Sequence, residues 1–441
     1  MAGTDDLLGV DAHVERIVAG VHPLPDFPLP LMDALGMAVA EDVVADQPLP
    51  FTDNAATDGY AVRRADVADA SPGHPVELPV VGEVHPGRAP HLALSPGTAV
   101  RIGAGAPVPS GADCVVPLSS TDAGVVRVLI ERPEPVGGNV RRAGGDVAQG
   151  DVVLSTGTVL GPRHLGLLAA LGRAQVRSRP RPRVVVISTG AELRDPGTPL
   201  THDTVHDGNS YLLAAAARAC GATVYRVGIL PDDVRHFSEA LSDQLVRADL
   251  VITSGGTSDG RYDVVREALG HLSPGHLSPG HLSPGHASLA PAPGDAGPDG
   301  SDRVWFGRVA LAPGAEQGFG HVGEDRVPIF CLPGDPVAAY ASFQAFVVPA
   351  LRTMMGKNPV QRPTRRARLT HRLSSTPGVR ELVCGTYGSD RGGVYFTPTG
   401  MAGAQTSGDL AASNAMVVLG EDVAGVSAGE MVQVWHLDEE F

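Results

Sequence analysis

Residues 183–193 read RVVVISTGAEL and residues 249–263 read DLVITSGGTSDGRYD, so one pattern occurs twice. Each segment has a short, mostly β-branched apolar run, 184–187 or 250–252, that stops at hydroxyl and glycine residues. Unbroken apolar runs of this length are typical of strands buried on both faces of a parallel sheet. Because parallel strands end at the same edge, both Ser/Thr/Gly turns are predicted to open into one crevice.

These two turns are candidates for an anion site. Glycine lets backbone N–H groups approach a bound anion, and the N-terminus of a following helix adds a favourable dipole. Glu192 and Asp263 would border the crevice, and Asp232, which follows the run 227–231, would reach the same edge from a third strand. The three carboxylates are predicted to lie within reach of one cation. The alternative is that both segments are ordinary βα turns, but the repetition favours a shared ligand site.

The composition indicates several globular domains. A chain of 441 residues with 43% hydrophobic residues is long enough for about three domains. A net charge of −15 argues against a nucleic-acid partner, which requires a basic face. The sequence shows no signal-peptide pattern and no apolar run of about 20 residues, and its four cysteines lack zinc-ligand spacing. We therefore expect a cytoplasmic protein with reduced thiols and no membrane contact.

The first 178 residues predict two interleaved domains. Apolar periodicity indicates helices over Val10–Ala19, Leu31–Ala45 and 161–171. Short alternating runs between Val76 and Glu131, separated by Pro/Gly turns, indicate a β-rich module. We expect a helical and linker domain formed by residues 1–47 with 139–178, and a β-rich domain inserted over 48–138.

The remainder predicts an α/β domain followed by a β domain. Strand and helix patterns alternate over 184–187, 209–220, 223–229, 234–247, 250–252 and 261–269. This alternation is typical of a doubly wound, mostly parallel sheet, which we place within 179–358, with a β domain over 359–441. Residues 270–303 contain a His-Leu-Ser-Pro-Gly repeat and are expected to form a disordered insertion, because no helix would hold its histidines together as metal ligands.

Eight segments of the chain occur in the order of a known family. They are PLPFTDNAATDGYAVR (48–63), RIGAGAPVPSGADCVV (101–116), GGNVRRAGGDV (137–147), VVVISTGAEL (184–193), HDGNSYLL (206–213), VGILPDD (227–233), LVITSGGTSDGRYD (250–263) and FCLPGDPVAAY (330–340). Together they resemble the molybdopterin molybdenumtransferase family, which includes bacterial MoeA and the E domain of gephyrin. The resemblance covers the chain except 270–303, and the chain looks like a divergent member.

The resemblance implies both an architecture and a reaction. The architecture has four domains, with the central α/β sheet resembling a molybdopterin-binding domain, in an elongated homodimer whose active site lies in a cleft between subunits. The reaction is insertion of molybdate into adenylylated molybdopterin, a small anionic pterin substrate, with Mg²⁺-dependent release of AMP. A molybdopterin adenylyltransferase is an expected partner, and molybdate versus tungstate stays open.

The resemblance also assigns residues. The acidic site residues of the family fall on Asp58, Asp146, Glu192, Asp232 and Asp263, of which Glu192, Asp232 and Asp263 are assigned to the metal. Carboxylates repel molybdate and phosphate, so they are expected to hold Mg²⁺, orient water or activate groups. The pterin and its phosphate are assigned to Ser188, Thr189, Gly190, Asn209, Ser254, Gly255, Gly256, Pro333, Gly334 and Asp335.

The chain departs from the family pattern where anions would be held. Alanine stands for serine at 55 and 404, for threonine at 104 and for lysine at 312 and 315, while Thr57, Cys384 and Asp335 replace methionine, arginine and asparagine. Two hypotheses follow. The intact carboxylates favour an enzyme with altered substrate anchoring, in which Arg308 can substitute for the lost lysines. The lost cations favour a catalytically degenerate pterin-binding or scaffolding paralogue.

Overall fold

The computed structural model describes residues 7–88, 93–256, 263–270 and 304–439, and it divides into two compact units. Unit 1 comprises Met1–Phe27, Gly36–Ala38 and Ser178–Phe441, and unit 2 comprises Pro28–Leu35 and Val39–Arg177. Each unit is described by itself. Of the insertion predicted over 270–303, all but Gly270 lies outside the described residues.

A six-stranded sheet in the order β15-β12-β16-β20-β19-β17 organises unit 1. The first four strands run parallel, β19 runs antiparallel to β20, and β17 runs antiparallel to β19, which confirms the predicted mostly parallel sheet. The run 184–187 is completely buried, as expected for a strand covered on both faces. The strand bounds are β12 Arg183–Ser188, β15 Thr223–Arg226, β16 Leu250–Ser254, β17 Trp305–Arg308, β19 Glu316–Val322 and β20 Val327–Leu332.

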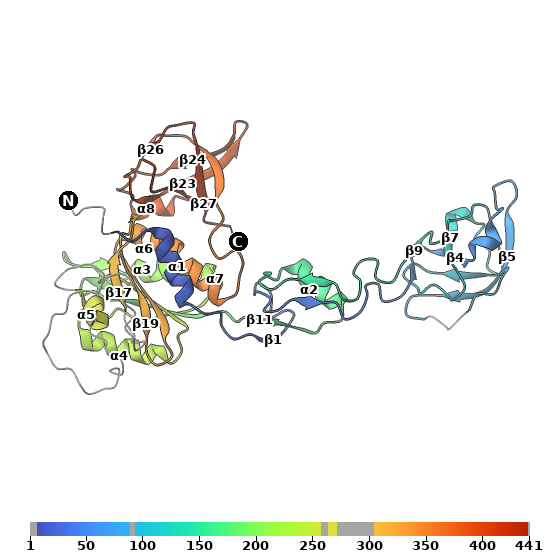
Figure 1. Ribbon diagram of the computed structural model, residues 1–441, viewed down its shortest axis with the longest axis horizontal. Coiled ribbons are helices and arrows are strands. Elements are labelled where there is room, and N and C mark those ends of the chain that lie inside the picture. Colours follow the sequence, from blue (N-terminus) through green and yellow to red (C-terminus); the bar gives the residue numbers. More distant parts are fainter. Residues whose placement is uncertain (1–6, 89–92, 257–262, 271–303, 440–441) are drawn as a thin grey trace. The chain divides into compact units, whose positions relative to one another are not determined.

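Helices cover both faces of this sheet (Figure 1). Val184 and Val186 pack with α1, α3, α6 and α7, whereas Val185 and Ile187 pack with α4 and α5, because successive strand residues point to opposite faces. The sheet is therefore doubly wound. The helices are α1 Val10–Gly20, α3 Asn209–Ala219, α4 Val234–Leu245, α5 Val264–Gly270, α6 Pro336–Ser342, a π-helical turn Phe343–Val347 and α7 Val348–Met354; the short strands β13 Leu193–Arg194 and β14 Val205–His206 pair beside them.

A closed β-barrel forms the C-terminal part of unit 1. Its strands pair in the order β23-β24-β21-β27-β25, and β25 also pairs with β23, which closes the ring around the buried Phe396. Closure leaves these strands without an unpaired edge. The elements are β21 Arg365–Leu369, β22 Leu373–Ser374, β23 Arg380–Asp390, β24 Gly393–Pro398, α8 Ser407–Ala411, β25 Ala415–Leu419, β26 Gly425–Val426 and β27 Met431–His436, with β18 Leu311–Ala312 alongside β23.

Unit 2 contains a five-stranded sheet in the order β7-β4-β6-β5-β8, built around the buried Tyr60 and Ile130. This sheet confirms the β-rich character expected from the short alternating runs. Its strands are β4 Gly59–Val62, β5 Val76–Val84, β6 Ala99–Ile102, β7 Cys114–Pro117 and β8 Arg127–Ile130. The other elements of this region are β1 Phe27–Pro30, β2 Val43–Val44, β3 Asn54–Ala55, β9 Val140–Arg141, β10 Val152–Leu154, α2 Pro162–Ala170, β11 Gln175–Ser178 and the 3₁₀ turns Arg64–Val67 and Leu118–Ser120.

The helix predicted over Leu31–Ala45 is wrong. The chain turns over 31–36 and forms only the two-residue strand β2, and Gly36 at φ +77° has a left-handed conformation that ends any helical turn. Ala34 and Val39 instead pack against Leu165 and Leu168 of α2. Their apolar spacing comes from contact with another element and not from the face of a helix.

The predicted grouping of residues 1–47 with 139–178 also differs from the structure. Val10, Val14 and Ile17 of α1 join the core of the α/β sheet, so residues 1–27 belong to unit 1. The amphipathic face of α1 gave no information on its partner. All four cysteines are free, and no helix in the described ranges combines the length and apolar character needed to cross a membrane.

The packing of β4 against β7 predicts that Gly59→Ala destabilises unit 2. A Cβ at position 59 would lie 2.0 Å from the Val116 carbonyl oxygen, and relief requires separating the paired strands. We expect a loss of about 1–3 kcal/mol in unfolding free energy, measured by urea unfolding. Gly166→Ala is the control: no atom outside its own helix lies within 4 Å, so it should stabilise α2 by about 0.5–1 kcal/mol. Equal urea unfolding midpoints for G59A and wild type would contradict the close approach of Gly59 to the Val116 carbonyl.

Candidate functional site

The strands β12 and β16 are neighbours at the topological switch point of the sheet. The chain continues from β12 to β15 on one side, whereas β17, β19 and β20, which follow β16 in the chain, lie on the other. In open α/β sheets, ligands bind outside the carboxyl ends of the strands at this point. Ser188 and Ser254 are register partners at these ends, so the two Ser/Thr/Gly turns open at the same edge, as their sequences predicted.

Glycines allow the turns at this edge to approach closely. Gly255 and Gly256 have φ values of +90° and +69°, and a Cβ on Gly334 would lie 3.6 Å from the Cα of Gly255. At Gly190, a Cβ would lie 2.6 Å from Oε2 of Glu192. The Glu192 carboxylate therefore folds back over Gly190, a position that a side chain would occupy.

Two glycine N–H groups do not face the crevice. Gly190 donates to the Leu230 carbonyl oxygen (3.2 Å) and Gly255 donates to that of Leu332 (3.0 Å). These bonds fasten each turn to the neighbouring segment of the sheet. The expectation that glycine N–H groups contact an anion is therefore wrong for these two positions, and polar side chains take a larger part.

Asn209, the first residue of α3, connects two of the strand ends. Its Nδ2 donates to Ser254 Oγ (2.8 Å) and to the Gly334 carbonyl oxygen (2.7 Å). Asn209 Oδ1 and Ser188 Oγ are both buried and have no hydrogen-bond partner among the described residues. Buried polar atoms are normally paired, so these two atoms keep hydrogen-bonding capacity at the strand ends. The N-terminal dipole of α3 favours an anion there.

A buried network that the sequence analysis missed fixes the start of α3. Asp207 is 2% exposed and accepts hydrogen bonds from Ser210 N (3.0 Å) and Ser210 Oγ (2.6 Å). Nε of Arg226 donates to Ser210 Oγ (2.9 Å), and the guanidinium lies 3.6 Å from the ring centre of Tyr211. The Asp–x–x–Ser spacing at a predicted helix start was the available signal. The network holds the first turn of α3, and with it Asn209.

The acidic residues of unit 1 lie at the ends of the same strands. Oδ2 of Asp232 accepts the Ala191 N–H (2.8 Å), so Asp232 and Glu192 flank one turn, and both are exposed. Asp263 immediately precedes α5. Within the described ranges, no three His, Cys, Asp or Glu side chains lie close enough to hold a metal ion. A joint cation site of Glu192, Asp232 and Asp263 stays a prediction.

The third turn, 333–335, has a structural role for its acidic residue. Pro333 and Gly334 follow β20, and the Asp335 carboxylate accepts the Ala338 N–H (2.8 Å) as the N-cap of α6. A capping residue accepts hydrogen bonds at a helix N-terminus, where a negative charge is favourable. The negative charge at position 335 is therefore accounted for by the helix it caps.

Unit 2 brings three of the motif segments together. Asp58 Oδ1 accepts the Ala104 N–H (2.7 Å), and Asp146 pairs with Arg141 (2.7 Å). Asp53 accepts the Ala143 N–H (2.8 Å) and pairs with Arg142, and these contacts, the N–H bond above all, lower the pKa of Asp53. These contacts and the pairing of β3 with β9 connect the segments around Asp58, Ala104 and Asp146.

Several positions that differ from the family pattern have clear environments. Cys384 is buried in β23, both its backbone N–H and carbonyl bond to the Gln405 side chain, and burial raises the pKa of its thiol to about 11. It is a neutral core group. Ala312 is half-buried in β18 and is the register partner of Glu381, whose pKa burial raises. Ala104, Ala315 and Ala404 add no charge.

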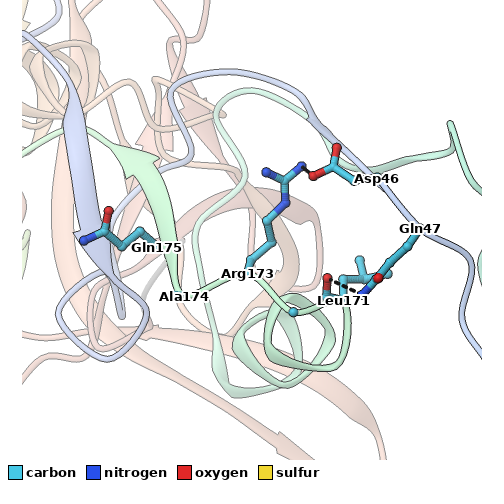
Figure 2. Close-up of a pocket in the computed structure, with 7 residues that line it drawn as sticks. Asp46, Gln47, Leu171, Arg173, Ala174 and Gln175 are labelled. Carbon is cyan, nitrogen blue, oxygen red and sulfur yellow. Dashed lines mark hydrogen bonds and ion pairs between the residues drawn. The ribbon is translucent and has the colours of Figure 1, made fainter. Parts of the chain in front are cut away.

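A cavity of about 480 Å³ in unit 2 contains none of these site residues. It is lined by Asp46, Gln47, Leu171, Gly172, Arg173, Ala174 and Gln175. Figure 2 shows Arg173 paired with Asp46 (2.7 Å) and Gln47 donating to the Leu171 carbonyl oxygen (3.2 Å). Its charged groups are thus paired within the cavity wall, and nothing in it extends the site described above.

Comparison with known proteins identifies the family. The MoeA N-terminal region (domain I and II) matches residues 8–172, the "probable molybdopterin binding domain" matches 185–281 and 294–353, and the MoeA C-terminal region (domain IV) matches 366–437. Molybdopterin molybdenumtransferase 2 of Mycobacterium tuberculosis is 43% identical over 409 residues, covering 93% of this chain and 94% of that protein. The chain belongs to the molybdopterin molybdenumtransferase family.

Two further relatives agree with this assignment. Molybdopterin molybdenumtransferase 1 of the same organism is 36% identical over 439 residues, covering 95% of this chain and 96% of that protein. The crystal structure of a molybdopterin biosynthesis MoeA protein from Pyrococcus horikoshii matches with a TM-score of 0.79 at 27% identity, covering 99% of this chain and 100% of that one. The family resemblance and the multidomain fold class expected from the sequence are both confirmed.

The turn bordered by Glu192 and Asp232 generates a prediction on local stability. In Asp232→Ala the Ala191 N–H loses its acceptor, so this amide should exchange with solvent about 10-fold faster. Asp233→Ala is the matched control, because Asp233 caps α4 through the His236 N–H (2.9 Å) and should affect only that amide. Hydrogen exchange resolved by residue distinguishes the two variants. If the Ala191 amide exchanges equally slowly in D232A and in wild type, Asp232 is not the acceptor that protects it.

Proposed function

We propose that this protein inserts molybdate into adenylylated molybdopterin and releases AMP, as a step of molybdenum cofactor biosynthesis. The observation that carries the proposal is the set of polar groups at the adjacent ends of β12 and β16, the switch point of the sheet. There the Asn209 side chain donates hydrogen bonds to Ser254 and Gly334. Asn209 Oδ1 and Ser188 Oγ are buried and form no hydrogen bond with the described residues. Family membership supports the same reaction.

Within this crevice the pterin and its phosphate would be held by the strand-end residues. Ser188 Oγ can donate a hydrogen bond and Asn209 Oδ1 can accept one, so together they suit a ligand with both kinds of polar group. The dipole of α3 would stabilise the phosphate. Because Gly255 and Gly334 have no side chains, neither position blocks a ligand phosphate at these strand ends.

The carboxylates suit Mg²⁺ bound together with the substrate. Magnesium is usually held by one or two carboxylates plus substrate phosphates and keeps several waters. Glu192 and Asp232, which flank one turn, provide such a pair, and Asp263, which precedes α5, is the third carboxylate that the resemblance assigns to the metal. When bound, the ion would neutralise phosphate charge. In unit 2, Asp58 accepts the Ala104 N–H and Asp146 pairs with Arg141, and the resemblance gives these two carboxylates the role of orienting water or activating groups.

A degenerate pterin-binding or scaffolding paralogue is the second candidate, and Ala312 and Ala315 favour it. These half-buried alanines supply no positive charge for molybdate. Arg308 is exposed on β17, where its register partner is Glu316.

An AMP-release assay separates the two candidates. With adenylylated molybdopterin, molybdate and Mg²⁺, the wild-type protein should release AMP in proportion to molybdate added. Glu192→Gln should lower the rate about 10- to 100-fold, since one charged ligand of the cation is lost. The control Glu239→Gln, on α4 and paired with Arg235, should retain full rate. Pterin binding without AMP release would establish the degenerate protein, and Ala312→Lys with Ala315→Lys should then strengthen molybdate binding.

We further propose that the protein is a cytoplasmic homodimer that receives its substrate from a molybdopterin adenylyltransferase. Val44 and Val152 are register partners on the β2–β10 pair and are 40% and 54% exposed, an apolar surface suited to self-association. Sedimentation at micromolar concentration should show a dimer, and Val44→Lys with Val152→Lys should shift it towards monomer. A wild-type monomer under these conditions would count against a shared cleft.

A further inference from the structure

Arg226 is the last residue of β15, and its side chain reaches the start of α3. β15 runs parallel to β12, and Arg226 is the register partner of Val186. Val224 and Val186 both pack on the face of the sheet that α3 covers, and residues two apart in a strand point to the same face. The Arg226 side chain therefore lies on the α3 side, near the edge at which β12 ends in Ser188.

Three contacts connect the Arg226 guanidinium with the first turn of α3. Nε donates to Ser210 Oγ (2.9 Å), and Nη2 lies 4.0 Å from Asp207 Oδ2. The guanidinium also lies over the Tyr211 ring, 3.6 Å from its centre. Among the described residues, Arg226 is the only cation that pairs with Asp207, which is buried. A buried carboxylate without a compensating partner is unfavourable, so the position of Asp207 depends on Arg226.

Asn209 lies inside the loop that this network closes, residues 207–210. Ser210 N and Ser210 Oγ both donate to the Asp207 carboxylate (3.0 and 2.6 Å), so the two residues between them are enclosed. Gly208, the N-cap of α3, forms no side-chain cap hydrogen bond, and the Asp207 carboxylate accepts the amide of the first turn in its place. The loop therefore fixes the backbone from which the Asn209 side chain extends.

The Asn209 side chain in turn connects the ends of two strands. Its Nδ2 donates to Ser254 Oγ at the end of β16 (2.8 Å) and to the Gly334 carbonyl oxygen after β20 (2.7 Å). Ser254 Oγ also donates to the Pro333 carbonyl oxygen (3.3 Å). These residues belong to the turns assigned to the pterin and its phosphate. A shift of the first turn of α3 would therefore reach both turns through one amide group.

We propose that Arg226 is a positioning residue for pterin binding. Through the loop 207–210 it holds Asn209 against the ends of β16 and β20. The inference rests on the proposed function for the identity of the ligand. Arg226 is not among the residues that the resemblance assigns, and in this role it does not touch the ligand. Loss of its guanidinium should therefore weaken pterin binding only as far as Asn209 contributes to that binding.

A double-mutant cycle on the full-length protein tests this coupling, with molybdopterin as the ligand and fluorescence titration as the measurement. Arg226→Met removes the charge and every donor but keeps a long side chain, and it should raise the Kd about 10-fold. Asn209→Ala should raise the Kd at least as much. Adding Arg226→Met to Asn209→Ala should then raise the Kd by less than about 2-fold more, because the residue through which Arg226 acts is already absent.

A second variant and a control make the result specific. Ser210→Ala breaks the hydrogen-bonded link and keeps both charged groups, so it carries the same test if Arg226→Met does not fold. It should weaken binding in the wild-type background and not in the Asn209→Ala background. Arg247→Met is the matched control, because Arg247 also lies over a tyrosine, Tyr225 (4.9 Å), which points to the other face of the sheet. This variant should leave the Kd unchanged.

Hydrogen exchange without ligand is a second readout. The Ser210 amide should exchange about 10-fold faster in Arg226→Met than in wild type, and at the wild-type rate in Arg247→Met. The inference would be overturned by an unchanged Ser210 amide, by an equal effect of Arg226→Met with and without Asn209, or by a wild-type protein that does not bind molybdopterin. Failure of the proposed function looks different: the coupling would be measured, but molybdate-dependent AMP release would be absent.

Discussion

Parallel pairing of β12 with β16 is the constraint on which the ligand crevice depends. It sets Ser188 beside Ser254 and places both strand ends at the switch point of the sheet. The turns can follow immediately because glycines accept the required backbone angles, and Asn209 then reaches from α3 to Ser254 and Gly334. A register shift of one residue would move every side chain of the strand to the opposite face, and the hydroxyl groups would no longer align.

For a protein that binds anions, the residues assigned to the site include many carboxylates and few positively charged side chains. The carboxylates are retained, whereas positions 312 and 315 carry no cation and position 384 is a buried thiol. Polyanion binding then depends on helix dipoles, on hydroxyl and amide side chains, and on a metal ion held with the substrate.

Sequence patterns predicted the structure correctly where residues close together in the chain determine it. The β-branched runs at 184–187 and 250–252 are buried strands, and the alternating elements between them form the predicted sheet. The same reasoning failed at 31–45, where the chain turns and Ala34 and Val39 pack against α2. It also misplaced α1, because an amphipathic face reports that a helix is covered and not which element covers it.

The sequence by itself determined the family, the strand-turn-helix order of the crevice and the acidic residues at its edge, because each depends on residues close together in the chain. Only the tertiary structure decided which polar groups are available. It showed that Gly190 and Gly255 donate their N–H groups to Leu230 and Leu332, and that Asp207 and Arg226 hold the start of α3. These contacts join residues far apart in sequence, and a hydrogen-bond donor used by a neighbouring strand cannot also bind a ligand.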